Sequence, residues 1–169
     1  NRSAIPSIVT EASRMNSPGW ETAINILVNI GEPAIQEVGN ALHFYSKDLD
    51  EYHPEIQGLC ILLEQMGSPV IDILLPELLH LVEEGTDENH VDEYALWPIQ
   101  RIGSPKADAV VQILSRIILS RRGERIRKIS IDALQKFDLS VIRPLVPVLR
   151  GCLLDASVAV RSSAQKTLE

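Results

Sequence analysis

The stretch Met66-Gly67-Ser68-Pro69-Val70-Ile71 is the most informative part of the sequence, because related hexamers recur at a nearly constant interval. Ile30-Gly31-Glu32-Pro33-Ala34-Ile35 lies 36 residues before it, and Ile102-Gly103-Ser104-Pro105-Lys106-Ala107 lies 36 residues after it. A more divergent copy, Phe137-Asp138-Leu139-Ser140-Val141-Ile142, follows 35 residues later. A fixed period of this length is typical of proteins built from stacked repeats.

Each hexamer predicts a turn between two helices. A hydrophobic residue closes an apolar run, and a glycine follows at the position where helix ends often need a left-handed residue. Ser68 and Ser104 are expected to cap the next helix through their hydroxyls, and Pro69 and Pro105 suit its first turn. Asp138 replaces the glycine in the last copy, so a differently built turn is expected there.

Apolar residues at helical spacing flank every turn. This pattern predicts an all-α fold of about ten helices, arranged as an α-solenoid in which helical hairpins stack into a right-handed superhelix. The chain is expected to be one repeat domain, with partial repeats at 1–15 and 157–169 and full repeats at 16–47, 52–85, 90–121 and 124–154. Because the outer repeats are incomplete, we expect a fragment of a longer solenoid.

Composition fits stacked helices and gives no indication of a membrane protein. The 169 residues are 45% hydrophobic but only 4% aromatic, which favours aliphatic layers. The most apolar stretch, 70–82, contains Asp72, Glu77 and His80, so no membrane span is expected. Cys60 and Cys152 fall two repeats apart, beyond disulfide reach, which predicts reduced thiols and a cytoplasmic location.

Charge is divided between the two parts of the chain. Residues 1–100 contain 3 Lys and Arg against 17 Asp and Glu, a net charge of -14, whereas residues 101–169 contain 13 against 6, a net charge of +7. In a solenoid, position in the sequence corresponds to distance along the axis, so one end should be acidic and the other basic. Such a chain would be a monomer or associate weakly head to tail.

We find no sequence signature of catalysis, of a metal site or of a cofactor. Residues 83–93, with His80 nearby, offer carboxylate and imidazole ligands, but their order does not match an EF-hand loop, and a solvated connector is favoured. Cys60 and Cys152 are interpreted as small core residues rather than nucleophiles. No glycine-rich phosphate loop is present. The predictions are therefore no catalytic residue, no metal and no cofactor.

A basic cluster surrounds the predicted turn near residue 122. Its six cations are Arg116, Arg121, Arg122, Arg125, Arg127 and Lys128. The cluster could contact nucleic acid, bind an acidic protein surface, or be solvated or paired within the chain. Binding to nucleic acid needs many neutralising contacts, and the acidic half would repel a duplex laid along the chain, so a nucleic-acid partner is disfavoured.

The C-terminal segment Leu153-Leu154-Asp155-Ala156-Ser157-Val158-Ala159-Val160-Arg161-Ser162-Ser163-Ala164 resembles the HEAT repeat pattern. In that pattern an Asp closes one repeat, and Val-Arg followed by Ala and Leu opens the next. Ile126-Arg127 and Val91-Asp92 match the opening less fully, and the Gly-x-Pro turns are similar to the bacterial HEAT-like repeats of phycobilisome lyases. The resemblance covers nearly the whole chain. It implies a solenoid with an Asp–Arg ladder only at Asp155 and Arg161, and it leaves function open, because the family includes scaffolds, lyases, transport receptors and a few enzymes.

The resemblance also implies that the second helix of each hairpin lines a concave face. With Ile35, Val38 and Leu42 as the buried stripe, the opposite columns would form a polar groove. The predicted partner-binding residues are Gln36, Asn40, His43, Asp72, His80, Asp108, Gln112, Arg143 and Arg150. The groove would change from acidic to basic along the chain and orient an extended partner by charge.

These observations predict a non-enzymatic scaffold or adaptor that binds a protein partner on a charged concave surface. One alternative is a lyase-type chaperone or enzyme that holds a small molecule in the concave face, which a pocket closed by Trp97 and His80 would favour. Another is an antitoxin-like inhibitor whose acidic half mimics nucleic acid. Aromatic residues such as Phe44 would be interface anchors only if they are exposed.

Overall fold

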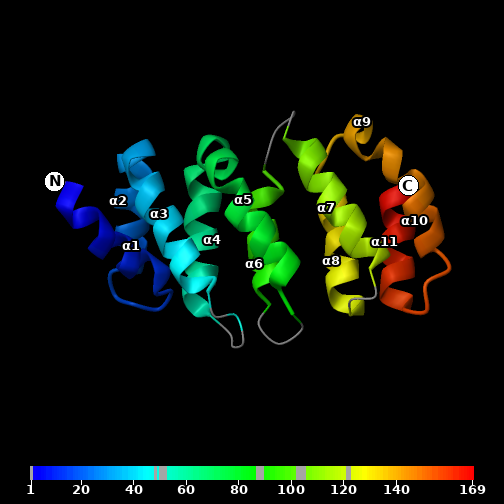
Figure 1. Ribbon diagram of the computed structural model, residues 1–169, viewed down its shortest axis with the longest axis horizontal. Coiled ribbons are helices and arrows are strands. Elements are labelled where there is room, and N and C mark those ends of the chain that lie inside the picture. Colours follow the sequence, from blue (N-terminus) through cyan, green and yellow to red (C-terminus); the bar gives the residue numbers. More distant parts are fainter. Residues whose placement is uncertain (1, 48, 50–52, 87–89, 102–105, 121–122) are drawn as a thin grey trace. The chain divides into compact units, whose positions relative to one another are not determined.

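The computed structural model describes the chain except for residues 1, 48, 50–52, 87–89, 102–105 and 121–122. The described residues form helices and turns without a strand, so the predicted all-α class is confirmed (Figure 1). Two compact units are present: unit 1 is Asn1–Ile102 and unit 2 is Gly103–Glu169. No helix within the described part is long and apolar enough to cross a membrane.

Unit 1 consists of helices packed in two rows. Its described helices are η1 (Arg2–Ala4), α1 (Ile5–Ser13), α2 (Trp20–Ile30), α3 (Glu32–Tyr45), α4 (Pro54–Met66), α5 (Ser68–Glu84) and α6 (Val91–Ile99). The first helices of the predicted hairpins pack in sequence, α2 on α4 and α4 on α6. The second helices, counting α1 as the first of them, pack likewise, α1 on α3 and α3 on α5.

Glycine ends two of these helices as predicted. Gly31 has φ 66° and Gly67 has φ 88°, and their N–H groups donate to the carbonyls of Leu27 (2.9 Å) and Leu63 (3.1 Å). The predicted hydroxyl cap of Ser68 is wrong, because Gly67 itself occupies the N-cap position and Ser68 is the first residue of α5. The equivalent positions 103 and 104 lie outside the described residues.

Unit 2 continues the alternation of first and second helices. Its described helices are α7 (Ala107–Leu119), α8 (Glu124–Leu134), α9 (Leu139–Ile142), η2 (Arg143–Leu145), α10 (Val146–Cys152) and α11 (Val158–Leu168). The first helices α8 and α11 pack together, and α7 packs on both α9 and α10. Ser157 caps α11, since its Oγ accepts from the N–H of Val160 at 3.4 Å.

The second helix of the last hairpin is not continuous. It is broken into α9, η2 and α10, because Pro144 and Pro147 have no N–H to donate to the helical ladder. The preceding turn is also built without a left-handed residue, as expected from the missing glycine. Asp138 is extended there, with φ -60° and ψ 143°.

The core is formed by the apolar columns that the repeats predict. The aliphatic residues of the predicted stripe Ile35, Val38 and Leu42, and those at the equivalent positions of the other second helices, are at most 8% exposed. These residues are Ile35, Val38 and Leu42 in α3, Ile71, Leu74 and Leu78 in α5, Ala107, Val110 and Leu114 in α7, and Ile142, Leu145 and Leu149 in the last hairpin. Because this stripe faces inward, the opposite columns of each second helix stay at the surface.

Candidate protein-interaction surface

Five of the predicted partner-binding residues lie in unit 1, on the adjacent second helices α3 and α5. Gln36, Asn40 and His43 are exposed on α3, and His80 is exposed on α5, whereas Asp72 is half-buried. The Nε2 of Gln36 donates to the Oδ1 of Asn40 at 3.2 Å, one helical turn further along. The exposed side of α3 is therefore a polar strip that is already internally hydrogen-bonded.

A pocket of about 270 Å³ lies between the second helices α1 and α3 of unit 1. It is lined by Pro6, Val9, Thr10, Glu37, Asn40, Ala41, Phe44 and Tyr45. Phe44 is 68% exposed and packs edge to face on Tyr45, with ring centroids 5.3 Å apart. Phe44 thus meets the exposure condition for an interface anchor.

The other four predicted partner-binding residues lie in unit 2. Asp108 and Gln112 are exposed on α7, Arg143 is exposed in η2, and Arg150 is exposed on α10. Helix α7 packs directly on α10. The structure therefore divides the nine predicted residues into two groups, one on the second helices of each unit.

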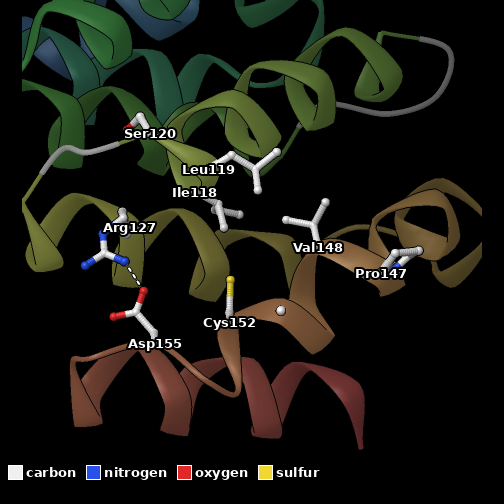
Figure 2. Close-up of a pocket in the computed structure, with 9 residues that line it drawn as sticks. Ile118, Leu119, Ser120, Arg127, Pro147, Val148, Cys152 and Asp155 are labelled. Carbon is white, nitrogen blue, oxygen red and sulfur yellow. Dashed lines mark hydrogen bonds and ion pairs between the residues drawn. The ribbon is translucent and has the colours of Figure 1, made fainter.

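A larger pocket of about 550 Å³ opens between α7 and α10 of unit 2 (Figure 2). It is lined by Ile118, Leu119, Ser120, Arg127, Pro147, Val148, Gly151, Cys152 and Asp155. The thiol of Cys152 points toward Ile118 and the side chain of Val148 toward Leu119, while Arg127 and Asp155 lie together at the other end (Figure 2). The pocket is thus apolar at one end and charged at the other.

Asp155 organises the charged end of this pocket. Its Oδ2 accepts from Nη1 of Arg127, and its Oδ1 accepts from the N–H of Ser157 at 2.8 Å. Nη1 of Arg161, the predicted ladder partner, donates to the main-chain carbonyl of Asp155 at 2.7 Å and to that of Ala156 at 2.9 Å. The carboxylate of Asp155 therefore links α8 to the start of α11.

The pKa values of the two titratable groups in this pocket move in opposite directions. Burial raises the pKa of Asp155, but the N–H of Ser157 and the charges of Arg127 and Arg161 outweigh it, so the pKa is lowered and the carboxylate stays ionised. Burial and the charge of Asp155 raise the pKa of Cys152, which Arg127 offsets only in part. The Cys152 thiol therefore stays protonated at neutral pH and is a poor nucleophile.

The two cysteines, Trp97, His80 and the acidic connector are the other groups of chemical interest in the sequence. Cys60 and Cys152 are free, buried thiols, and burial raises the pKa of Cys60 as well. Trp97 packs edge to face on Tyr94, with centroids 5.1 Å apart, and His80 is exposed. Among the described residues, which exclude 87–89 of the acidic connector, no three His, Cys, Asp or Glu side chains are grouped to hold a metal ion.

The sequence does not indicate the larger pocket or the pairing of Arg127 with Asp155, and it places Arg127 in the basic cluster. One signal was present: Arg127 follows Ile126 just as Arg161 follows Val160, 34 residues later, in the column where the HEAT pattern has its arginine. Comparison with protein-family models, with curated proteins and with solved structures gave no match.

Proposed function

We propose that this chain is a non-enzymatic scaffold or adaptor domain that binds a protein partner on the face formed by its second helices. The main support is a feature common to both units. In each unit a pocket opens between neighbouring second helices, α1 and α3 in unit 1 and α7 and α10 in unit 2. The same helices expose the polar residues predicted to bind a partner, including Asn40, which lines the smaller pocket.

The proposal includes an α-solenoid of HEAT-like repeats with the repeat boundaries given above. Within each unit, first helices pack on first helices and second helices on second helices, which is the contact pattern of stacked hairpins. Equivalent columns of successive hairpins are also buried alike. A right-handed superhelix would place the second helices on its concave side.

Charge supports a partner that binds in one direction. Unit 1 contains 4 Lys and Arg against 17 Asp and Glu, a net charge of -13, and unit 2 contains 12 against 6, a net charge of +6. A protein partner with the opposite polarity would be oriented by these charges, and its association would weaken with salt. The excess of carboxylates in unit 1 argues against a nucleic-acid partner on that unit, and free thiols support a cytoplasmic location.

A capture experiment with charge-reversed variants tests the proposal. The immobilised 169-residue chain would be used to isolate partners identified by mass spectrometry, and the dissociation constant of each would be measured for Asp72→Lys and Asp108→Lys. We expect Asp72→Lys in the acidic unit 1 to bind about tenfold more weakly, because the reversed charge opposes the basic part of the partner. Asp108→Lys adds a cation to the basic unit 2 and should bind the acidic part of the partner more tightly.

The matched control is Glu21→Lys, which makes the same change at an exposed carboxylate in the first turn of α2, a first helix. Circular dichroism would verify the fold of all three variants. Equal affinities for the wild type, the control and both second-helix variants would refute binding on this face.

The acidic-mimic hypothesis has one specific observation in its favour, the net charge of -13 on unit 1. If it were correct, the captured partner would be a basic nuclease, and duplex DNA would compete with the chain for it. A partner that binds in the presence of excess duplex would favour the adaptor instead.

A further inference from the structure

The pocket between α7 and α10 has the lining of a site for an aliphatic side chain. Ile118 and Cys152 are at most 8% exposed and form its buried apolar wall, while Leu119 at the rim is 67% exposed. Val148 and Leu119 point toward one another across it (Figure 2). An apolar group placed here would be covered by branched aliphatic carbon and the protonated thiol, without meeting an unpaired charge.

The pocket is open to solvent, which indicates the kind of molecule that fits. Sites for free small molecules commonly bury 70–90% of the ligand, and an open pocket does not. An open pocket with an exposed aliphatic rim instead suits a side chain that projects from a larger body, whose main chain stays outside. This is the usual arrangement of an anchor residue at a protein interface.

The charges around the pocket favour an acidic body. Unit 2 has 12 Lys and Arg against 6 Asp and Glu. Arg150 is exposed and directly precedes the lining residue Gly151, and Arg161 lies against the main chain of Asp155 at the charged end. Since Arg127 and Asp155 are paired with each other, Arg150 and Arg161 are the cations that would attract a carboxylate next to the anchor residue.

We propose that this pocket binds a leucine-type side chain of an acidic protein segment, with carboxylates of that segment lying toward Arg150 and Arg161. The inference rests on the proposed function and names the chemistry of the partner for unit 2. It makes the α7–α10 pocket the anchoring point of the second-helix face.

Gly151 provides a way to block the pocket while preserving the fold. It lies in α10, lines the pocket, and a Cβ added to it would meet nothing within 4 Å. Gly151→Leu should therefore fill the pocket, and Gly151→Ala should fill it only slightly. Ser162→Leu, at an exposed position of α11, adds the same side chain outside the pocket and is the matched control.

The probe is a fluorescein-labelled synthetic peptide with leucines spaced three and four apart among glutamates. Matched peptides replace the leucines by alanine or the glutamates by lysine. Binding to the full chain at near-physiological salt would be followed by fluorescence anisotropy and by NMR shifts of residues 118–120 and 147–152. We expect the acidic leucine peptide to bind at least about tenfold more tightly than either matched peptide. Gly151→Leu, but not Ser162→Leu, should weaken it by a similar factor.

Any of the following outcomes would overturn the inference. Equal binding of the lysine peptide would exclude an acidic partner. Undiminished binding to Gly151→Leu would exclude this pocket as the binding site. Tighter binding of octanoate than of the peptide would make the occupant a small carboxylate, and self-association abolished by Gly151→Leu would make it a second copy. A captured protein that binds Gly151→Leu normally yet responds to Asp72→Lys and Asp108→Lys would refute the pocket while leaving the proposed function intact.

Discussion

Asp155 connects segments of unit 2 that lie far apart in the sequence. Its carboxylate accepts from Arg127 of α8, 28 residues earlier, and from the N–H of Ser157 at the start of α11. The side chains of Arg127 and Asp155 are only 18% and 15% exposed, so their interaction is less screened by water than that of a surface pair. The packing of α8 on α11 should therefore depend in part on this residue.

Asp155→Asn should destabilise unit 2 by about 2 kcal/mol, because it leaves Arg127 without its carboxylate partner. The lowered pKa sets the pH dependence: the contribution is complete above the unfolded-state pKa of about 4 and is lost as the pH falls through the lower folded-state pKa. Below that range wild type and variant should converge in stability. Urea unfolding at several pH values, with hydrogen exchange of α8 and α11 amides, would measure this.

Asp132→Asn is the control for this prediction. The carboxylate of Asp132 accepts from Nζ of Lys128 at 2.5 Å within α8, but the two side chains are 37% and 43% exposed. Exposed pairs of this kind contribute less than about 0.5 kcal/mol. If the two variants lost equal stability, the special role of Asp155 would be excluded.

The Arg127–Asp155 contact could not be predicted from the local pattern of residues. The C-terminal segment correctly predicted a last helix, which the structure has at Val158–Leu168, yet its pattern suggested Arg161 as the partner of the Asp155 carboxylate. Which guanidinium reaches the carboxylate depends on how closely α8 approaches the turn before α11, and that distance is not encoded in local spacing. The α7–α10 pocket could not be predicted for the same reason, because it too depends on how closely the helices approach one another.

Glycine is the residue that sets where the helices end in unit 1. Gly67 has φ 88° and ψ -173°, a combination essentially restricted to glycine. A Cβ added at Gly67 would meet nothing within 4 Å, so any cost of a side chain there comes from the backbone and not from a clash. A substitution of Gly67 therefore tests whether the backbone of the turn between α4 and α5 requires the glycine that the hexamers repeat.

Gly67→Ala should destabilise unit 1 by about 2 kcal/mol, because alanine resists this backbone conformation. Gly151→Ala adds the same methyl group within α10, also into open space, and should raise stability by about 0.5 kcal/mol. Thermal and urea unfolding would compare the two. Opposite signs would confirm that the backbone of the turn, rather than lost space, requires glycine; a neutral Gly67→Ala would contradict it.

The helix boundaries show which elements a sequence can predict. Helix α2 runs from Trp20 to Ile30, because apolar spacing and a following glycine specify both the face and the end of that helix. The second helix of the last hairpin is harder to predict: Pro144 and Pro147 interrupt its hydrogen-bond ladder, and the structure has a 3-10 segment between two short helices. The outcome depends on how the missing hydrogen bonds at two prolines combine with the packing of α9 and α10 on α7.

At the scale of the whole chain, charge and structure divide at nearly the same place. Lys and Arg are sparse up to residue 100, and unit 1 ends at Ile102, within the third copy of the turn hexamer. The periodicity gave no indication of this division, because the interval between hexamers changes there only from 36 to 35 residues. The charge distribution did, since net charge changes sign there.

A chain with one acidic and one basic unit should associate weakly with itself when charges are poorly screened. At about 10 mM ionic strength the Debye length is about 30 Å, so unit 1 of one molecule attracts unit 2 of another, and the contact can repeat. Light scattering at high protein concentration should then give an average mass above that of the monomer. Near 150 mM salt, where the Debye length is about 8 Å, the monomer should return. Gly151→Leu should leave this behaviour unchanged, because net charge and not the α7–α10 pocket drives it; a single monomeric mass at low salt and high concentration would show that the opposite charges of the two units do not attract between molecules.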